Sequence, residues 1–201
     1  RDRDVTGVQT CALPIYVYFP DDLDGFCPTW INGEFLAKAS SDKGSMVVGD
    51  ARYRALYVDA DLLAHDVLEQ LIRLADEGVR IILKKDPSEP GTTRHENYYD
   101  LVSKLKEYTN VSTVMPADLN PFINGSVIPR HWCRIDGESL YIFFPNPSSD
   151  RLKFPIEYGQ SLNTEERSVD VTVNLMGKPV ELHLKFSPYQ SLLFRIEDGR
   201  A

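Results

Sequence analysis

The chain has 201 residues, of which 42% are hydrophobic and 10% aromatic, a composition that supplies a buried core and excludes wholesale disorder. Its 22 Lys and Arg residues against 30 Asp and Glu give a formal net charge of −8. This acidic balance argues against a sequence-independent nucleic-acid binder, which needs a concentrated basic surface. No apolar run approaches the roughly 20 residues of a membrane-spanning helix, so we expect no membrane span.

Residues 1–15 show neither a helical nor a strand period, and no apolar core follows their charged start as it would in a secretory signal. They resemble, almost residue for residue, the translation of a sequencing-adapter read that recurs at the ends of metagenomic gene fragments. We therefore expect this stretch to be an artefact, with the protein's own sequence beginning near Tyr16 and its gene truncated upstream. The alternative is a flexible N-terminal arm.

Residues 16–120 alternate short β-type runs with amphipathic helical patterns. The clearest helix has Asp61 as its expected N-cap and Gly78 as its stop. A strand, a helix and a second strand in succession make a β-α-β unit, whose strands are parallel. We therefore predict a flavodoxin-like or Rossmann-like α/β module, with strands at 16–19, 54–58, 79–83 and 111–114 and helices at about 30–39, 62–75 and 96–108.

The pattern changes near residue 120, in a stretch rich in proline and glycine that indicates a domain boundary between residues 117 and 129. Beyond it, residues 169–175 and 180–186 alternate apolar and polar side chains, and Asp136-Gly137-Glu138 is a hairpin turn signal between two apolar runs. Strict alternation buries one face of a strand and solvates the other. We therefore predict a second domain, an antiparallel β-sandwich over residues 125–199.

The sequence predicts no cofactor and no metal. A phosphate-binding loop needs glycine directly after a strand, whereas residues 59–61 are Asp-Ala-Asp. The histidines include no i, i+4 pair of the kind that a helical metal site uses. Asp22 begins a run like that of a calcium loop, but the closing position of such a loop falls on Gly33 in place of Glu.

The cysteines Cys11, Cys27 and Cys133 are widely separated and form neither a disulfide framework nor a C-x-x-C metal pair. We interpret Cys27 and Cys133 as packing residues, since free cysteine is commonly buried and inert. Asp59 and Asp61 are interpreted as helix-capping residues and not as paired glycosidase carboxylates. No catalytic residue is predicted.

Four residues are candidates for carbohydrate contact: Trp30, Trp132, His95 and Tyr98. Sugars stack their C–H faces on exposed aromatic rings, while a few polar groups meet the hydroxyls. Trp30 lies in irregular chain, whereas Trp132 adjoins a predicted strand, where core packing is the favoured interpretation. His95 lies in the loop that follows the strand at 79–83, and loops often carry binding residues.

Several short motifs resemble the region that follows the catalytic barrel in large glycoside hydrolases, with α-L-rhamnosidase-like enzymes the family that we suggest and the β-galactosidase trimerisation-type domain a related comparison. They are a Tyr-Arg-x-Leu strand at 53–56, an Ala-x-x-Gly helix end at 75–78, an Asp-Gly hairpin at 136–137 leading to Asn146, and a Pro- and Ser-preceded last strand at 188–194. The resemblance implies a flavodoxin-like module followed by a β-rich domain. It also implies that the catalytic carboxylates lie in an upstream barrel, and that the protein is periplasmic or extracellular.

We therefore expect a non-catalytic accessory region of a multidomain glycoside hydrolase, with the upstream catalytic domain of the same chain as its partner. Loop 84–95 is the segment that we expect to reach the substrate cleft. One alternative is a carbohydrate-binding module that uses exposed aromatic side chains. Another is a free-standing small α/β enzyme.

Overall fold

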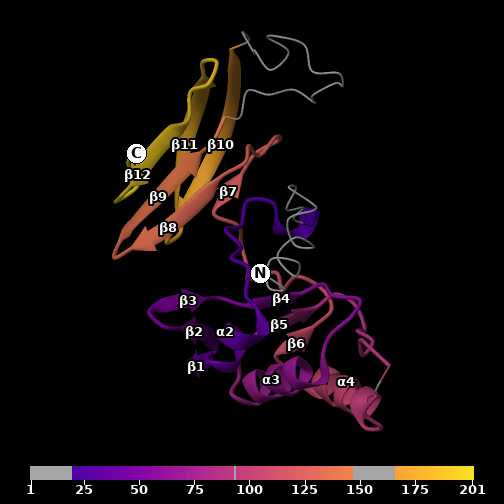
Figure 1. The fold of residues 1–201 in the computed structure, drawn as a ribbon. Coiled ribbons are helices and arrows are strands. Elements are labelled where there is room, and N and C mark those ends of the chain that lie inside the picture. Colours follow the sequence, from indigo (N-terminus) through magenta and orange to yellow (C-terminus); the bar gives the residue numbers. More distant parts are fainter. Residues whose placement is uncertain (1–19, 93, 147–165) are drawn as a thin grey trace, which may run out of the picture. The chain divides into compact units, whose positions relative to one another are not determined.

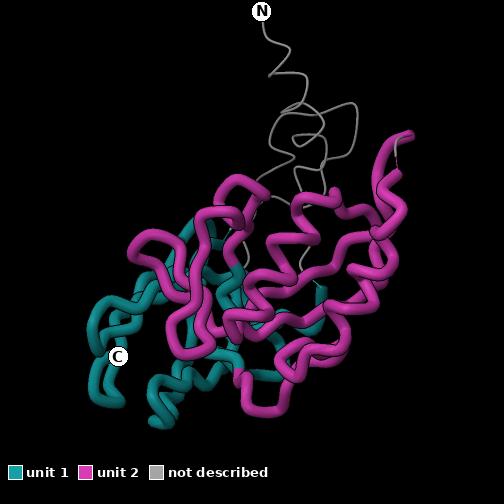
Figure 2. The backbone as a smooth tube through the Cα atoms, turned by 90° about the horizontal axis from the view of Figure 1, so that it is seen from below, with its two compact units in different colours: residues 1–28, 121–201 teal, residues 29–120 magenta. Residues whose placement is uncertain are grey.

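The computed structural model describes residues 20–92, 94–146 and 166–201. The chain divides into two compact units, one of residues 29–120 and one of residues 1–28 together with 121–201 (Figure 2). The adapter-like residues 1–15 and the predicted strand at 16–19 lie outside the described residues. The segment 20–28, which the sequence placed with the α/β module, belongs to the unit of antiparallel strands.

The unit of residues 29–120 contains a parallel sheet of three strands, β4 (Leu56–Val58), β5 (Ile81–Leu83) and β6 (Val111–Ser112), in that order. Both neighbouring pairs are parallel, as the β-α-β pattern predicted. The connections are α3 (His65–Asp76) and α4 (Tyr98–Glu107), which lie on the same side of the sheet (Figure 1). The mixed α/β class is thus confirmed, while the flavodoxin-like assignment stays a prediction because the sheet has three strands in sequential order.

Of the two predicted ends of α3, the structure contradicts the start and confirms the stop. The predicted N-cap is wrong, because the helix begins at His65 with Ala64 as its N-cap. The chain before it is extended: the Ser88 N–H donates to the carbonyl of Asp61 at 2.9 Å. The helix stop is confirmed, since Gly78 has a φ of +88° and its N–H donates to the carbonyl of Ala75.

An antiparallel sheet that the sequence did not predict precedes β4. Its strands are β1 (Ser40–Asp42), β2 (Ser45–Val48) and β3 (Ala51–Tyr53), in that order. The first turn has Lys43 and Gly44 at positive φ, which is typical of a tight hairpin. Before this sheet, α2 (Gly33–Ala37) lies inside the predicted helix at 30–39 and is capped by Asn32, whose Oδ1 accepts from the N–H of Phe35 at 2.9 Å.

The core of this unit is made mainly by the apolar faces of α3 and α4 packed against β4 and β5. It contains Leu36, Met46, Leu56, Leu68, Leu71, Leu74, Ile81, Leu83, Val102 and Leu105 among its buried residues. Within the described parts of the chain, neither of these helices nor any other combines the length and the apolarity that crossing a bilayer requires.

In its described residues, 20–28, 121–146 and 166–201, the second unit contains two antiparallel sheets of three strands each. One has the order β11-β10-β7 and the other β12-β9-β8. The predicted hairpin at Gly137 is confirmed, and a second hairpin, between β10 and β11, turns at Gly177; both glycines have positive φ. The strands are β7 (Ile123–Asn124), β8 (Trp132–Asp136), β9 (Ser139–Phe144), β10 (Arg167–Leu175), β11 (Lys178–Phe186) and β12 (Leu192–Ile196), preceded by a 3-10 turn at Asp21–Leu23.

Both sheets contribute side chains to a single buried cluster. It includes Ile123, Leu140, Ile142, Phe144, Val171, Val173, Leu182, Leu184, Phe186 and Ile196. The period-two alternation predicted for β10 and β11 therefore gives one buried face, as expected. The antiparallel character of this region is established, and the sandwich assignment stays a prediction.

Candidate functional site

The most elaborate polar cluster of the first unit lies where the parallel strands end. His65 is the first residue of α3 and follows β4, while Glu89 and His95 lie in the loop between β5 and α4. The carboxyl ends of parallel strands share one edge of a sheet, where ligand sites of α/β proteins gather. The two loops meet there, since the Leu63 N–H donates to the carbonyl of Ser88 at 3.0 Å.

Glu89 fixes His95 through two contacts. One carboxylate oxygen lies 2.5 Å from Nδ1 of the ring, and the other accepts the backbone N–H of His95 at 2.7 Å. Because a carboxylate only accepts, we assign the ring proton of this pair to Nδ1. The Glu89 residue is 9% exposed, whereas the His95 side chain is about half exposed, and its Nε2 takes no part in the contact with Glu89.

The electrostatics of Glu89 follow from these contacts. Burial by itself would raise the pKa of this carboxyl group, but the hydrogen bonds from the His95 ring and backbone bring the pKa below its ordinary value, with the charges of His95 and His65 adding to them. Glu89 is therefore held as a carboxylate that orients the imidazole, in the way that an acid residue orients a histidine in many active sites.

His65 completes the cluster by stacking on His95, with ring centroids 4.0 Å apart and an angle of 23° between the planes. Its Nε2 lies 3.3 Å from Oδ1 of Asn97. The His65 side chain is mostly covered. Neither His65 nor Glu89 was singled out by the sequence as a site residue; the Pro90-Gly91 turn between Glu89 and His95 is the signal that could have paired those two.

Tyr98, a predicted carbohydrate contact, adjoins the same cluster from inside the core. Its ring is 6.5 Å from that of His65, and its hydroxyl donates to the carbonyl of Leu63 at 2.7 Å. Burial raises its pKa, with further contributions from the charges of Glu89 and Tyr99. The residue is 1% exposed, which leaves no ring face on which a sugar could stack.

Asp59 and Asp61 lie at the same edge, but they do not cap α3. Both accept from the ammonium group of Lys85, with Nζ 3.0 Å from Asp59 and 3.3 Å from Asp61. These two hydrogen bonds raise the pKa of Lys85. The aspartates are thus charge partners of a lysine, and the capping interpretation is wrong.

The two tryptophans belong to different units. Trp30 precedes α2 and Trp132 begins β8; the first is 68% and the second 70% exposed. Core packing, the favoured interpretation for Trp132, is therefore wrong. Of the four predicted contacts, His95 and Tyr98 share a neighbourhood, through His65.

The described residues include one group of metal-ligand type, Cys27, His131 and Cys133, whose ligand atoms lie within 4.8 Å of one another. Cys27 and Cys133 form a disulfide, so their interpretation as free packing residues is wrong. The ring nitrogens of His131 lie 2.9 Å from the carbonyl of Pro129 and 2.8 Å from that of Phe26. The two sulfur atoms are bonded to each other and both ring nitrogens lie against carbonyl oxygens. The group therefore joins segments of the chain and is a poor metal site.

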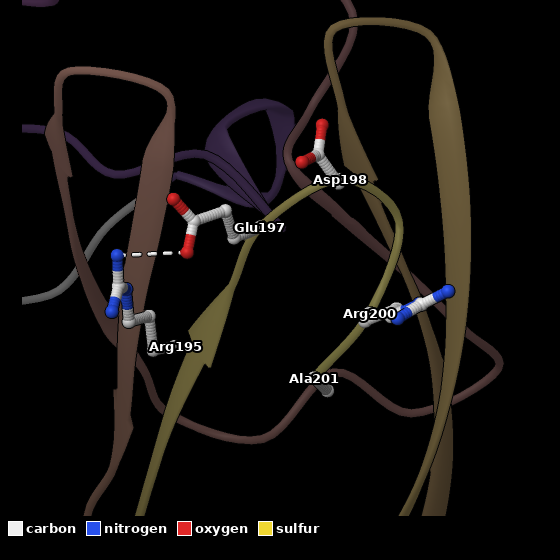
Figure 3. Close-up of a pocket in the computed structure, with 5 residues that line it drawn as sticks. All are labelled: Arg195, Glu197, Asp198, Arg200 and Ala201. Carbon is white, nitrogen blue, oxygen red and sulfur yellow. Dashed lines mark ion pairs between the residues drawn. The ribbon is translucent and has the colours of Figure 1, made fainter.

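A surface depression follows β12 and has a volume of about 480 Å³ (Figure 3). It is lined by Arg195, Glu197, Asp198, Arg200 and Ala201, and Arg195 binds Glu197 at 2.7 Å. Another depression, of about 140 Å³, adjoins Arg130 and Arg167. Both are open and polar, unlike the enclosed, mostly apolar pockets that bind small molecules.

Neither a family model nor a curated protein matches this sequence. The structure is similar to that of a rhamnosidase from Novosphingobium sp. PP1Y, with a TM-score of 0.65 and 15% sequence identity over 92% of this chain. The match covers 21% of the rhamnosidase chain, so this chain spans about a fifth of that protein's length. At this identity the likeness is one of fold.

Proposed function

We propose that this chain is a non-catalytic accessory region of a multidomain glycoside hydrolase of the α-L-rhamnosidase type, which supports an upstream catalytic barrel. The observation that carries the proposal is the unequal coverage of the structural match: 92% of this chain corresponds to 21% of a rhamnosidase. The region that this chain matches is one part of that larger enzyme. Because the likeness is one of fold, the function is an inference by analogy.

The chemistry of the carboxylates favours a role without catalysis. A glycosidase needs a carboxylic acid whose pKa is raised so that it protonates the leaving group. Glu89 has a lowered pKa and is held by His95, and Asp59 and Asp61 share one lysine. In the depression of Figure 3, Glu197 is paired with Arg195, and Asp198 lies 3.5 Å from Nζ of Lys178.

We further propose that the loop between β5 and α4 contributes a contact to the substrate cleft of the upstream domain. Glu89 holds both the backbone and the ring of His95, which makes this loop pre-organised. The half-exposed imidazole offers Nε2 to a sugar hydroxyl. His95 would then position substrate, and its loss would raise KM more than it lowers kcat.

The first test is hydrolysis by the purified chain. We expect no release of nitrophenol from 4-nitrophenyl α-L-rhamnopyranoside or from other aryl glycosides above the rate in buffer. Turnover by this chain that is abolished in Glu89→Gln would overturn the proposal in favour of a free-standing small α/β enzyme. The matched control is Asp198→Asn, which alters an exposed carboxylate of the depression and leaves the His95 cluster intact.

The second test is recovery of the coding sequence upstream of residue 16. A preceding catalytic barrel supports the proposal, and a natural start near residue 16 contradicts it. With the longer enzyme in hand, we expect His95→Ala to raise KM severalfold at nearly constant kcat, whereas His183→Ala, on the exposed face of β11, leaves both unchanged.

Carbohydrate binding is the second candidate function, and the observation that favours it is the exposure of Trp30 and Trp132. An exposed indole ring offers a flat apolar face, and ligand sites are lined mainly by hydrophobic and aromatic side chains. This role is compatible with the accessory one, because both leave the chemistry to another domain.

A further inference from the structure

The solvent-facing side of the sheet β12-β9-β8 carries a row of large apolar side chains. The strand register places Trp132 beside Phe143 and Phe143 beside Leu193, so the three lie across neighbouring strands on the same face. Their exposures are 70%, 37% and 69%. The opposite face of the same strands contributes Leu140 and Ile142 to the core, so these side chains have no core to join.

This row departs from the pattern of an ordinary half-buried sheet, whose outer face is polar. Scattered apolar residues at a surface need no explanation, but adjacent ones mark a surface that binds something. Because neighbouring strands lie about 4.8 Å apart, the row is a flat strip about 10 Å long. Such a strip suits the flat C–H face of a sugar ring better than it suits an apolar side chain of a partner protein, which needs a deep pocket.

The next row along the same strands supplies polar groups. Arg134, Tyr141 and Arg195 lie side by side there, with the guanidinium carbon of Arg195 5.9 Å from the Tyr141 ring centroid. Arg195 is fixed from two sides, by Ser139 Oγ at 3.1 Å from Nη2 and by Glu197 at 2.7 Å. The donors of Arg195 are therefore pre-oriented beside the apolar strip.

The charges of this face balance. Arg134 and Arg195 contribute two positive charges, and Asp136 and Glu197, at the end of the same strands, contribute two negative ones. A face without a dominant sign has no electrostatic preference for an anion or a cation. Its mixture of guanidinium donors and carboxylate acceptors suits hydroxyl groups, which both donate and accept.

We propose that the outer face of β12-β9-β8 binds a neutral carbohydrate chain, with Trp132 stacking on a sugar ring and Arg134 and Arg195 meeting its hydroxyls. The extent of the face supports this ligand over a protein. Three strands of about five residues give an area of roughly 14 by 17 Å, about 240 Å², against about 800 Å² on each partner of a standard protein interface. The proposal gives the second candidate function, carbohydrate binding, a defined surface. It rests on the accessory role only for the choice of the sugars to be tested.

The chain offers a direct reporter, because it contains two tryptophans, Trp30 and Trp132. In the Trp30→Phe variant all tryptophan fluorescence comes from Trp132. We would titrate this variant with three neutral oligosaccharides, one that contains L-rhamnose, xylohexaose and cellohexaose, up to about 10 mM, the range of weak single-site affinity. A saturable spectral shift with at least one neutral oligosaccharide is the expected result.

Calorimetry on variants of the full 201-residue chain then locates the site. Trp132→Ala is expected to weaken binding at least about tenfold, and Arg134→Ala about threefold, since aromatic stacking area outweighs one exposed hydrogen bond. The matched control is Met176→Ala, which removes an apolar side chain of nearly equal exposure, 71%, from the turn between β10 and β11 and should leave the affinity unchanged.

Three outcomes would overturn the inference. One is the absence of a saturable shift with every oligosaccharide. Another is full affinity in Trp132→Ala, which would place the ligand elsewhere. The last is concentration-dependent self-association that Trp132→Ala abolishes, which would make this face a protein interface. Each outcome leaves the hydrolysis assay untouched, so the accessory role is tested separately.

Discussion

Cys27 and Cys133 form a disulfide although 106 positions separate them in the sequence; their Cα atoms are 5.9 Å apart. The segment between them includes all of the unit of residues 29–120. The covalent loop therefore begins just before that unit and ends after it, at β8. A bond of this kind ties together the two passages of the chain that flank an inserted unit.

Reduction of this disulfide is expected to destabilise the protein. In the chain-entropy model, opening a loop of about 100 residues costs up to about 4.7 kcal/mol, an upper limit for a single bond. Thermal unfolding with and without a phosphine reductant measures the effect, and the double variant Cys27→Ala, Cys133→Ala should unfold at one temperature under both conditions. Equal melting of the unaltered chain in both buffers, with three titratable thiols before reduction, would contradict the bond.

The disulfide is also relevant to the cellular compartment of the protein. Disulfides of this structural kind persist in oxidising compartments and are rare in the cytosol. The bond thus supports the periplasmic or extracellular location that the resemblance to secreted glycoside hydrolases implies, and this location stays a proposal.

The loop that carries His95 is expected to loosen in acid. The pKa of Glu89 is lower in the folded chain, so its carboxylate stabilises the loop above the ordinary glutamate range, and this contribution disappears as the pH falls through the lowered value. Amide hydrogen exchange of His95 should therefore accelerate as the pH falls below the ordinary value of 4.5, beyond the intrinsic change in exchange rate.

Glu89→Gln separates charge from hydrogen bonding. Its amide oxygen still accepts one bond, but it carries no charge, so we expect faster exchange at His95 that no longer shows the acid transition. Glu69→Gln, on the exposed side of His65, is the matched control and should leave the transition in place. An unchanged profile in Glu89→Gln would show that another group holds the loop.

The hydroxyl group of Tyr98 is expected to stabilise the folded chain. The buried ring places its O–H 2.7 Å from the carbonyl of Leu63, in the extended segment before α3. Tyr98→Phe leaves that carbonyl without its donor, at a cost of about 1–3 kcal/mol. Chemical denaturation followed by circular dichroism measures this loss in the free energy of unfolding. Tyr99→Phe, at an exposed neighbouring ring, should change the stability by less than about 0.5 kcal/mol, and an equal effect of the two variants would contradict the role of this bond.

The features that the sequence predicted are those set by local pattern. The helical period of residues 62–75 located α3, and Gly78 located its end, because a left-handed residue closes a helix through contacts within a few positions. The start of α3 was misplaced, because Asp61 is held by Ser88, a partner from another loop. Long-range pairing of this kind leaves no trace in a local window.

The same distinction applies to the candidate sites. Cys27 with Cys133 and His65 with His95 meet only through the tertiary fold, so no spacing in the sequence indicated either pair. The row formed by Trp132 and Phe143 on the outer face of β12-β9-β8 differs, because a local hairpin sets it. The hairpin at Gly137 sets the register that brings Trp132 opposite Phe143, and alternation around the buried Ile142 points Phe143 outward. That part of the row was within reach of the sequence.

Gly25 is expected to be the least replaceable glycine of the second unit. Its carbonyl accepts the N–H groups of Phe122 at 2.9 Å and Ile123 at 3.1 Å, which attaches the segment 20–28 to β7. Its φ is +75°, and a Cβ atom there would lie 1.9 Å from the carbonyl oxygen of Ile123. Both the backbone conformation and the space exclude a side chain.

We expect Gly25→Ala to lower the free energy of unfolding of this unit by at least about 2 kcal/mol, because strain of about 1–2 kcal/mol adds to a clash with backbone that cannot move aside. The matched control is Gly137→Ala, at a φ of +59° with open space around the site, which should show the strain alone. Urea denaturation followed by the fluorescence of Trp132 in the Trp30→Phe background compares the two variants within the same unit. If they lose equal stability, the close approach of Gly25 to Ile123 does not constrain the fold.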